Sequence, residues 1–341
     1  MRMKCLSFFG LMALTVPILH AQPTNGAVYW STTPPDCSNL NQSPMAITNT
    51  SGTTIGYSCY VSGTFVWFAA GGVWGTAIRV AAPASGAIGV SYSFYDTNGK
   101  SLSLNVKGSH SASGNSAKFA LDANQPAEID LLGATSDAPK YADTATGSVY
   151  AVFYCPDAPT CSDVLPQLIY SALPSKPWSL SVPIAWDDVV WTQWSAVGVD
   201  DGDTRRVSLV IDNEDTTATS FTVRVYNSAG TLVGSGKTPS IAPLQNLGNG
   251  SYGPGGTYGA LLSEIISTKL PSGVFKVLVD GGSSYCAVEM LQVNGQSATA
   301  LQVAYDAVPP SHSGAAGVRR SNLRDLRVQS TPRTVFDPLP K

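Results

Sequence analysis

The sequence predicts an all-β protein made of two tandem antiparallel β-sandwich domains and a disordered C-terminal tail. Strong helix formers are scarce, since only four of the 341 residues are glutamate, while Val, Thr, Ser, Gly and Tyr are plentiful. The 32 glycines and 23 prolines separate short, alternating apolar segments, as in a sandwich. Two blocks of strand-like sequence also recur in the same order, which indicates an internal repeat.

The first repeated block relates the two halves without a gap, at an offset of 131 residues. Each copy is an alternating strand that ends in a turn. Because side chains alternate between the two faces of a strand, the apolar positions of each copy should lie in a core. The aligned segments are Ile78–Val80 with Leu209–Ile211, Val90–Tyr95 with Phe221–Tyr226 and Asp96–Gly99 with Asn227–Gly230, and the predicted core positions are Val90, Tyr92 and Phe94 with Phe221, Val223 and Val225.

A second block aligns at an offset of 125 residues. Two blocks in the same order, at nearly the same spacing, predict a duplication. We therefore expect one sandwich over residues 22–175 and a second over residues 184–308, with a short linker at 174–177; a β-barrel is the structural alternative. The second block places Val149–Phe153 over Val274–Leu278, Cys161 over Cys286, Leu165 over Met290 and Gln167 over Gln292.

The repeated strands and their Gly, Asn and Pro turns resemble the tandem immunoglobulin-like or fibronectin-like repeats of secreted and surface proteins of bacteria. The resemblance covers residues 75–305 in outline and rests on strand pattern. It implies Ig-like sandwich domains, a location outside the cytoplasm and a binding or structural role. It supplies no functional residues.

Both ends of the chain differ from its body. Residues 1–21 read as a signal peptide, with an apolar run of 15 residues from Cys5 to Leu19 and expected cleavage after Ala21. No other stretch reaches the ~20 apolar residues of a transmembrane helix, so none is expected. Residues 309–341 carry a net charge of +4 and lack a strand pattern, which predicts a mobile basic tail. We expect a secreted, periplasmic or cell-surface protein.

The charge balance bears on the class of partner. Only 13 % of the residues are charged, the net charge is −3, and residues 22–308 carry −9. An acidic body does not suit the phosphate backbone, so we expect no nucleic-acid partner. An extracellular protein or a glycan fits this balance, and the sequence does not identify either one.

The cysteines predict two disulfides in an exported protein. Cys155 and Cys161 flank a short segment that reads as a hairpin loop, and Cys37 would then pair with Cys59. Cys286 remains, and we expect it to be a buried free thiol, with a reactive or intermolecular thiol as the alternative.

Residues for catalysis are few. His110 is the one histidine within the predicted domains, and its polar loop predicts a solvated side chain rather than a general base. Asp187 and Asp188 are neighbours, and neighbours on a strand point to opposite faces, so they do not form a glycosidase-like pair. We expect no catalytic residue and no enzymatic activity; a carboxylate-based glycoside hydrolase is the least favoured alternative.

Oxygen-rich side chains gather at Asp200, Asp201 and Asp203, directly before the predicted strand at 207–211. Such a cluster could hold Ca²⁺, although it lacks the EF-hand spacing and the closing glutamate. A solvated turn is the simpler interpretation. We therefore expect no cofactor, with calcium as the alternative.

Aromatic residues give the best hint of binding. Four of the seven tryptophans fall within a short segment, at Trp178, Trp186, Trp191 and Trp194. Exposed indole rings can stack on sugars, whereas buried ones would pack a core or the junction between the sandwiches. The sequence thus predicts a non-enzymatic exported protein of surface structure, adhesion or recognition, with a carbohydrate-binding module that uses this segment as the alternative.

Overall fold

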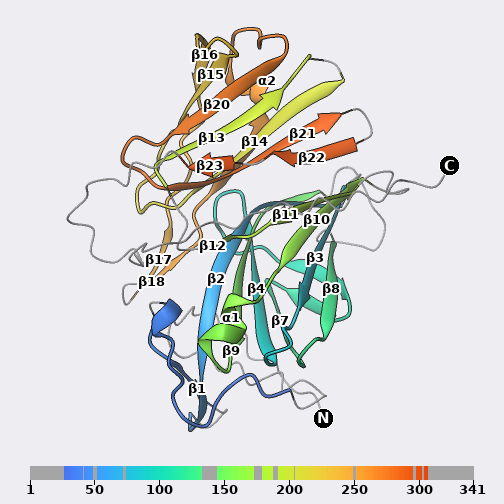
Figure 1. Cartoon of the computed structure of the whole chain (residues 1–341), viewed down its shortest axis with the longest axis vertical. Coiled ribbons are helices and arrows are strands. Elements are labelled where there is room, and N and C mark those ends of the chain that lie inside the picture. The colour runs from blue at the N-terminus through green and yellow to red at the C-terminus, as the bar shows by residue number, and fades with distance from the viewer. Residues whose placement is uncertain are drawn as a thin grey trace, which may run out of the picture.

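The computed structural model shows an all-β fold in which antiparallel sheets are stacked in pairs (Figure 1). It describes residues 27–40, 42–48, 52–71, 74–132, 144–172, 179–186, 191–202, 204–248, 251–294, 297–301 and 303–305. The predicted signal peptide, linker and basic tail lie outside the described residues, as do Trp178, Asp187, Asp188 and Asp203.

The first sheet pair is formed by β1 to β12. One sheet has the strand order β1-β2-β9-β4-β7, with β12 also paired to β2, and the other has the order β11-β10-β3-β8-β5-β6. Both sheets contribute to one apolar core, as in a β-sandwich. The elements are the 3-10 helix η2 (Ser38–Leu40), β1 (Met45–Thr48), β2 (Thr54–Ala70), β3 (Trp74–Ala81), β4 (Ile88–Asp96), β5 (Leu104–Gly108), β6 (Ala112–Gly114), β7 (Ser116–Leu121), β8 (Pro126–Leu132), β9 (Ala145–Cys155), α1 (Ala158–Ser162), β10 (Gln167–Ala172), β11 (Ser179–Pro183) and β12 (Ala185–Trp186).

The second sheet pair is formed by β13 to β23. Its sheets have the orders β16-β15-β20-β13-β23 and β19-β14-β21-β22, and they enclose a second core. A separate hairpin joins β17 to β18. The elements are β13 (Gln193–Val199), β14 (Arg205–Asn213), β15 (Thr222–Asn227), β16 (Leu232–Lys237), β17 (Gln245–Gly248), β18 (Ser251–Gly253), β19 (Thr257–Leu261), α2 (Leu262–Ile265), β20 (Val274–Asp280), β21 (Cys286–Asn294), β22 (Ser297–Leu301) and β23 (Val303–Tyr305).

The same strand order recurs in both pairs. In the first pair β2-β9-β4-β7 faces β11-β10-β3-β8, and in the second β13-β20-β15-β16 faces β22-β21-β14-β19. Each strand of one series has its counterpart at the same place in the other, in the same chain order. The repeat seen in the sequence is therefore a repeat of topology.

The first aligned block is confirmed in its register. The predicted core positions Tyr92, Phe94, Val223 and Val225 are fully buried. The turn that follows each strand has the same hydrogen bonds. Asp96 Oδ1 accepts from the amides two and four residues ahead, and Asn227 Oδ1 does the same. A short acceptor side chain at this position thus closes both turns.

The second aligned block is wrong in its register. On the ladder to β4, Val149 pairs with Phe94, and on the ladder to β15 the residue that pairs with Val225 is Val277. Since Phe94 corresponds to Val225, Val149 corresponds to Val277 rather than to Val274, which is exposed. A three-residue error reverses the face of a strand. The offset is therefore 128 residues in β9 and β20.

The last strands of the second block, β10 and β21, align at yet another offset. Leu168 pairs with Ile78, and Met290 pairs with Leu209, the residue that corresponds to Ile78. Met290 thus matches Leu168, not Leu165. Cys161 lies in α1 whereas Cys286 begins β21, so these two cysteines are not counterparts.

Candidate functional site

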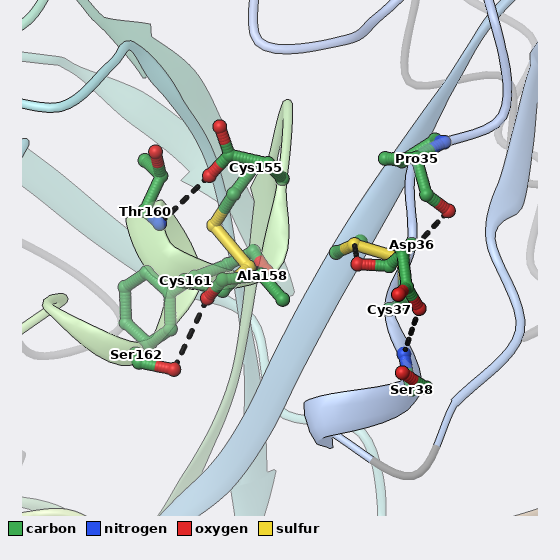
Figure 2. The surroundings of a disulfide bond; sticks show 12 residues. Pro35, Asp36, Cys37, Ser38, Cys155, Ala158, Thr160, Cys161 and Ser162 are labelled. Atoms are coloured by element: carbon green, nitrogen blue, oxygen red, sulfur yellow. Dashed lines mark hydrogen bonds between the residues drawn. A yellow bond between two sulfur atoms is a disulfide. The ribbon is translucent and has the colours of Figure 1, made fainter.

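Two disulfides fasten one end of the first sheet pair (Figure 2). Cys37 bonds to Cys59 and Cys155 bonds to Cys161, as the cysteine count predicted. Cys59 and Cys155 are opposite one another on the ladder between β2 and β9, so the bridges lie close together. They tie the segment before β1 to β2 and the helix α1 to the end of β9.

The loop between Cys155 and Cys161 is a short helix rather than the expected hairpin. Asp157 is the N-cap of α1, and its Oδ1 accepts the amide hydrogen of Thr160 at 2.8 Å. A capping aspartate followed by proline in the first turn favours a helix start. Figure 2 shows Thr160, Cys161 and Ser162 on this turn.

Cys286 is a free thiol and is fully buried. Its Sγ donates to the carbonyl oxygen of Trp191 at 3.5 Å, and burial raises its pKa well above the ordinary value. A protonated, enclosed thiol is unreactive. This placement matches the expected structural thiol.

The tryptophan segment does not form an exposed platform in its described part. Trp191 and Trp194 are 8 % and 7 % exposed and belong to the second core, where Trp194 Nε1 donates to the carbonyl oxygen of Cys286 at 2.7 Å. Trp186 is half-buried and meets Phe153 edge to face, with ring centroids 6.1 Å apart. Buried rings cannot stack on a sugar, so Trp191 and Trp194 serve packing.

The acidic loop before β14 uses its described carboxylates internally. Asp200 is buried and accepts the amide hydrogens of Gly202 and Val207 at 2.8 Å each. Asp201 accepts from Thr204 and forms an ion pair with Arg205. These bonds shape the turn into β14. Among the described residues, no three His, Cys, Asp or Glu side chains are placed to hold a metal ion.

His110 is not the solvated loop residue that the sequence suggests. Its ring stacks on Phe119 with centroids 4.1 Å apart and planes 5° apart. Partial burial lowers its pKa. The contact gives His110 a packing role at the edge of the first sheet pair.

The junction between the sheet pairs is the feature that the sequence did not reveal. Val66 of β2 packs against Val210 and Ala287 on the outer face of β14 and β21. The Trp67 ring lies so near Gly259 that a side chain there would contact it at 3.2 Å. The strands β2 and β14 thus join the two sheet pairs through an apolar contact.

Two polar contacts also cross this junction. The Thr257 amide donates to the carbonyl oxygen of Thr97 at 3.0 Å, and Gln245 Nε2 donates to the carbonyl oxygen of Gly99. The β4 turn of the first pair therefore docks on the start of β19.

Buried acids lie beside these contacts. Asp212 is fully buried, neither of its carboxyl oxygens meets a side-chain donor among the described residues, and the charge of Glu214 lies near it. Burial, followed by the charge of Glu214, raises the pKa of Asp212 well above its ordinary value. Asp212 and Asn213 are the last two residues of β14.

Glu289 of β21 is the second such acid. The residue is half-buried, but its Oε1 atom is buried without a partner and its carboxyl group contacts the phenol of Tyr170 on β10. Burial raises the pKa of Glu289 to about 8. A sequence signal was present, because Glu289 shares its strand face with the apolar residues Ala287 and Leu291.

Comparison with known proteins does not place the chain in a family. No family model matches it, and a search of the curated proteins finds no similar sequence. Among the described residues, no helix is both long and apolar enough to cross a bilayer.

Proposed function

We propose that the chain is an exported, non-enzymatic protein that acts in surface structure, adhesion or recognition. The observation that carries the proposal is the pair of disulfides in the first sheet pair, because such bonds form and persist outside the reducing cytoplasm. The resemblance to tandem repeats of bacterial surface proteins points the same way. Secretion, display at the cell surface and a periplasmic location all agree with it.

The repeated topology supports a finer part of the proposal. Each sheet pair has its own core and the same strand order, as expected for two Ig-like domains that arose by duplication. Sandwiches of this kind present loops at both ends, and these loops are common sites of recognition.

Side-chain roles in the structure favour binding over catalysis. His110 packs on Phe119, Asp200 and Asp201 hold their own loop, and Asp212 is enclosed. A glycoside hydrolase needs two carboxyl groups that reach the substrate. The acids Asp200, Asp201 and Asp212 instead hold a loop or are enclosed within the fold.

Export and binding are tested separately. The gene is expressed in a host with its own leader, and the mature chain is recovered from outside the cytoplasm; mass spectrometry should show cleavage after Ala21 and both disulfides. Recovery of an unprocessed, fully reduced chain from the cytoplasm would refute export.

Binding is then measured with the mature chain on arrays of extracellular proteins and glycans, with the reduced chain as control. We expect binding that the reduced chain loses. Glycan binding that Trp178→Ala and Trp186→Ala abolish, but Trp74→Ala leaves intact, would instead establish the carbohydrate-binding alternative. Hydrolysis of a glycan on the array would overturn the non-enzymatic proposal.

A further inference from the structure

The acids on the junction face are buried. Asp212 is fully buried, and neither of its carboxyl oxygens meets a side-chain donor among the described residues. Burial, followed by the charge of Glu214, raises the pKa of Asp212 well above its ordinary value, and the backbone amide of Asn213 offsets this only in part. Burial therefore favours the protonated acid.

Glu289 is the second such acid. Its Oε1 atom is buried without a hydrogen-bond partner among the described residues, and its carboxyl group lies beside the hydroxyl of Tyr170, which donates to the carbonyl oxygen of Trp67. A hydrogen bond from Tyr170 favours the ionised carboxylate, but burial outweighs it and raises the pKa of Glu289 to about 8. Tyr170 of β10 thus connects Glu289 of β21 with Trp67 of β2.

These acids lie on the face that joins the sheet pairs. Asp212 shares its face of β14 with Val210, and its register partners are Ala287 and Thr257. Val210 is the register partner of Glu289. Ionisation at either place would put charge into the contact with Val66, where solvation is poor.

Other titratable groups near this face are already engaged. Cys286 of β21 senses the charges of Asp212, Glu214 and Asp280 but is held protonated by burial. Arg206, on the same face of β14 as Val210, bonds to Ser263 and Gly202. Asp96 of the docked turn accepts its own turn's amides. From β2 and β19 the face meets Val66, Trp67, Thr257 and Gly259, which carry no charge.

We propose that the junction is a proton-dependent latch, closed while Asp212 and Glu289 hold their protons and opened when these acids ionise. Its direction follows from linkage. The folded chain keeps the Glu289 proton up to about pH 8, whereas an exposed glutamate loses it near pH 4.5, so the latch weakens as the pH rises between these values. Burial, followed by the charge of Glu214, raises the pKa of Asp212 as well, so Asp212 acts in the same sense.

The scarcity of glutamate allows a direct test on the unaltered chain. Labelling with glutamate that carries ¹³C at its carboxyl group gives signals from Glu128, Glu214, Glu264 and Glu289 alone. We expect Glu289 to show a protonated-acid shift at neutral pH, with Glu128, which pairs with Arg79, as the internal control. Four fully ionised signals at neutral pH would overturn the proposal.

A variant test separates proton dependence from packing. Asp212→Asn with Glu289→Gln supplies neutral donors of the same shape. The wild-type melting temperature should fall by roughly 5 °C or more between about pH 5 and pH 8.5, and the double variant should lose most of this fall. Glu128→Gln is the matched control and should keep it. If the melting temperature of the double variant fell with pH as steeply as that of the wild type, the latch would be contradicted. If the double variant does not fold, the ¹³C signals of the glutamate carboxyl groups decide the question.

Exchange of backbone amide hydrogens shows where the structure opens. The Thr257 amide crosses the junction to Thr97, whereas the amides of β15 bond within the second sheet pair. After correction for intrinsic rates, Thr257 should lose protection above about pH 8 by tenfold or more relative to β15. Equal loss at both places would show that the acids stabilise the whole fold and not a latch.

Discussion

The two sheet pairs have the same strand order and are stabilised by different means. The first contains both disulfides and adds β1, β5, β6 and β12 to the shared set of strands. The second contains no disulfide among its described residues, and its one cysteine lies in the core beside Trp191 and Trp194. The topology therefore does not depend on the bridges, and alternating apolar strands are enough to specify it.

The difference in stabilisation has a physical basis. A disulfide acts mainly on the unfolded chain, whose freedom it limits, whereas a core residue acts on the folded state through packing. The two pairs should therefore respond differently to reductant and similarly to loss of an apolar side chain.

The largest expected effect is the loss of a core side chain from the pair without bridges. Phe221 is fully buried, and Phe221→Ala should lower the free energy of unfolding by about 3–5 kcal/mol. Its counterpart Val90→Ala should cost less, because fewer atoms are removed. Denaturant unfolding followed by circular dichroism measures both, and a larger loss for Val90→Ala would contradict the equivalence of the two positions.

The disulfides should come next. They close loops with sequence separations of 22 and 6 residues. In the chain-entropy model Cys37→Ser with Cys59→Ser should cost about 3 kcal/mol, and Cys155→Ser with Cys161→Ser about 2 kcal/mol. Cys286→Ser is the control for loss of a buried sulfur without a bridge. Unfolding in urea would refute the model if the shorter loop proved the more costly to open.

Local pattern could predict the strands and the first repeat, because period-2 apolar residues and the acceptor side chains of Asp96 and Asn227 act over a few residues. The second register could not be predicted in this way. Val149–Phe153 of β9 is an unbroken run of apolar and aromatic residues, although buried and half-buried positions alternate along it, so the run looks the same when moved by three residues. Register there is set by the neighbouring strands β2 and β4.

The junction between the sheet pairs could not be predicted from local sequence pattern either, because it also depends on a neighbouring strand. Val210 and Glu289 face away from their own core, and only the approach of β2 makes that face an interior. Charged side chains are usually solvated, so Glu289 and Asp212 read as surface residues. The tryptophans show the reverse, since Trp191 and Trp194 looked available for binding and lie in the core.

The turns of the two repeats make a matched pair for testing the junction. Gly99 and Gly230 have φ of +74° and +77°, in the left-handed region that favours glycine. An added Cβ at Gly99 would lie 2.7 Å from the carbonyl oxygen of Gly255 in the second sheet pair. Gly99→Ala should therefore cost backbone strain of about 1–2 kcal/mol together with a displaced junction. The exchange rate of the Thr257 amide should rise in this variant.

Gly230→Ala should give the smallest change. An added Cβ there meets nothing within 4 Å, so the substitution carries only the left-handed strain of about 1–2 kcal/mol, partly offset because alanine restricts the unfolded chain. Its effect should stay within the β15–β16 hairpin and leave the Thr257 amide protected. The difference between the losses in free energy of unfolding for Gly99→Ala and Gly230→Ala then measures how much the docking of the first turn on β19 contributes to stability. Equal losses in the free energy of unfolding, measured by denaturant unfolding of the full chain, would mean that contact between this turn and the second sheet pair does not contribute to stability.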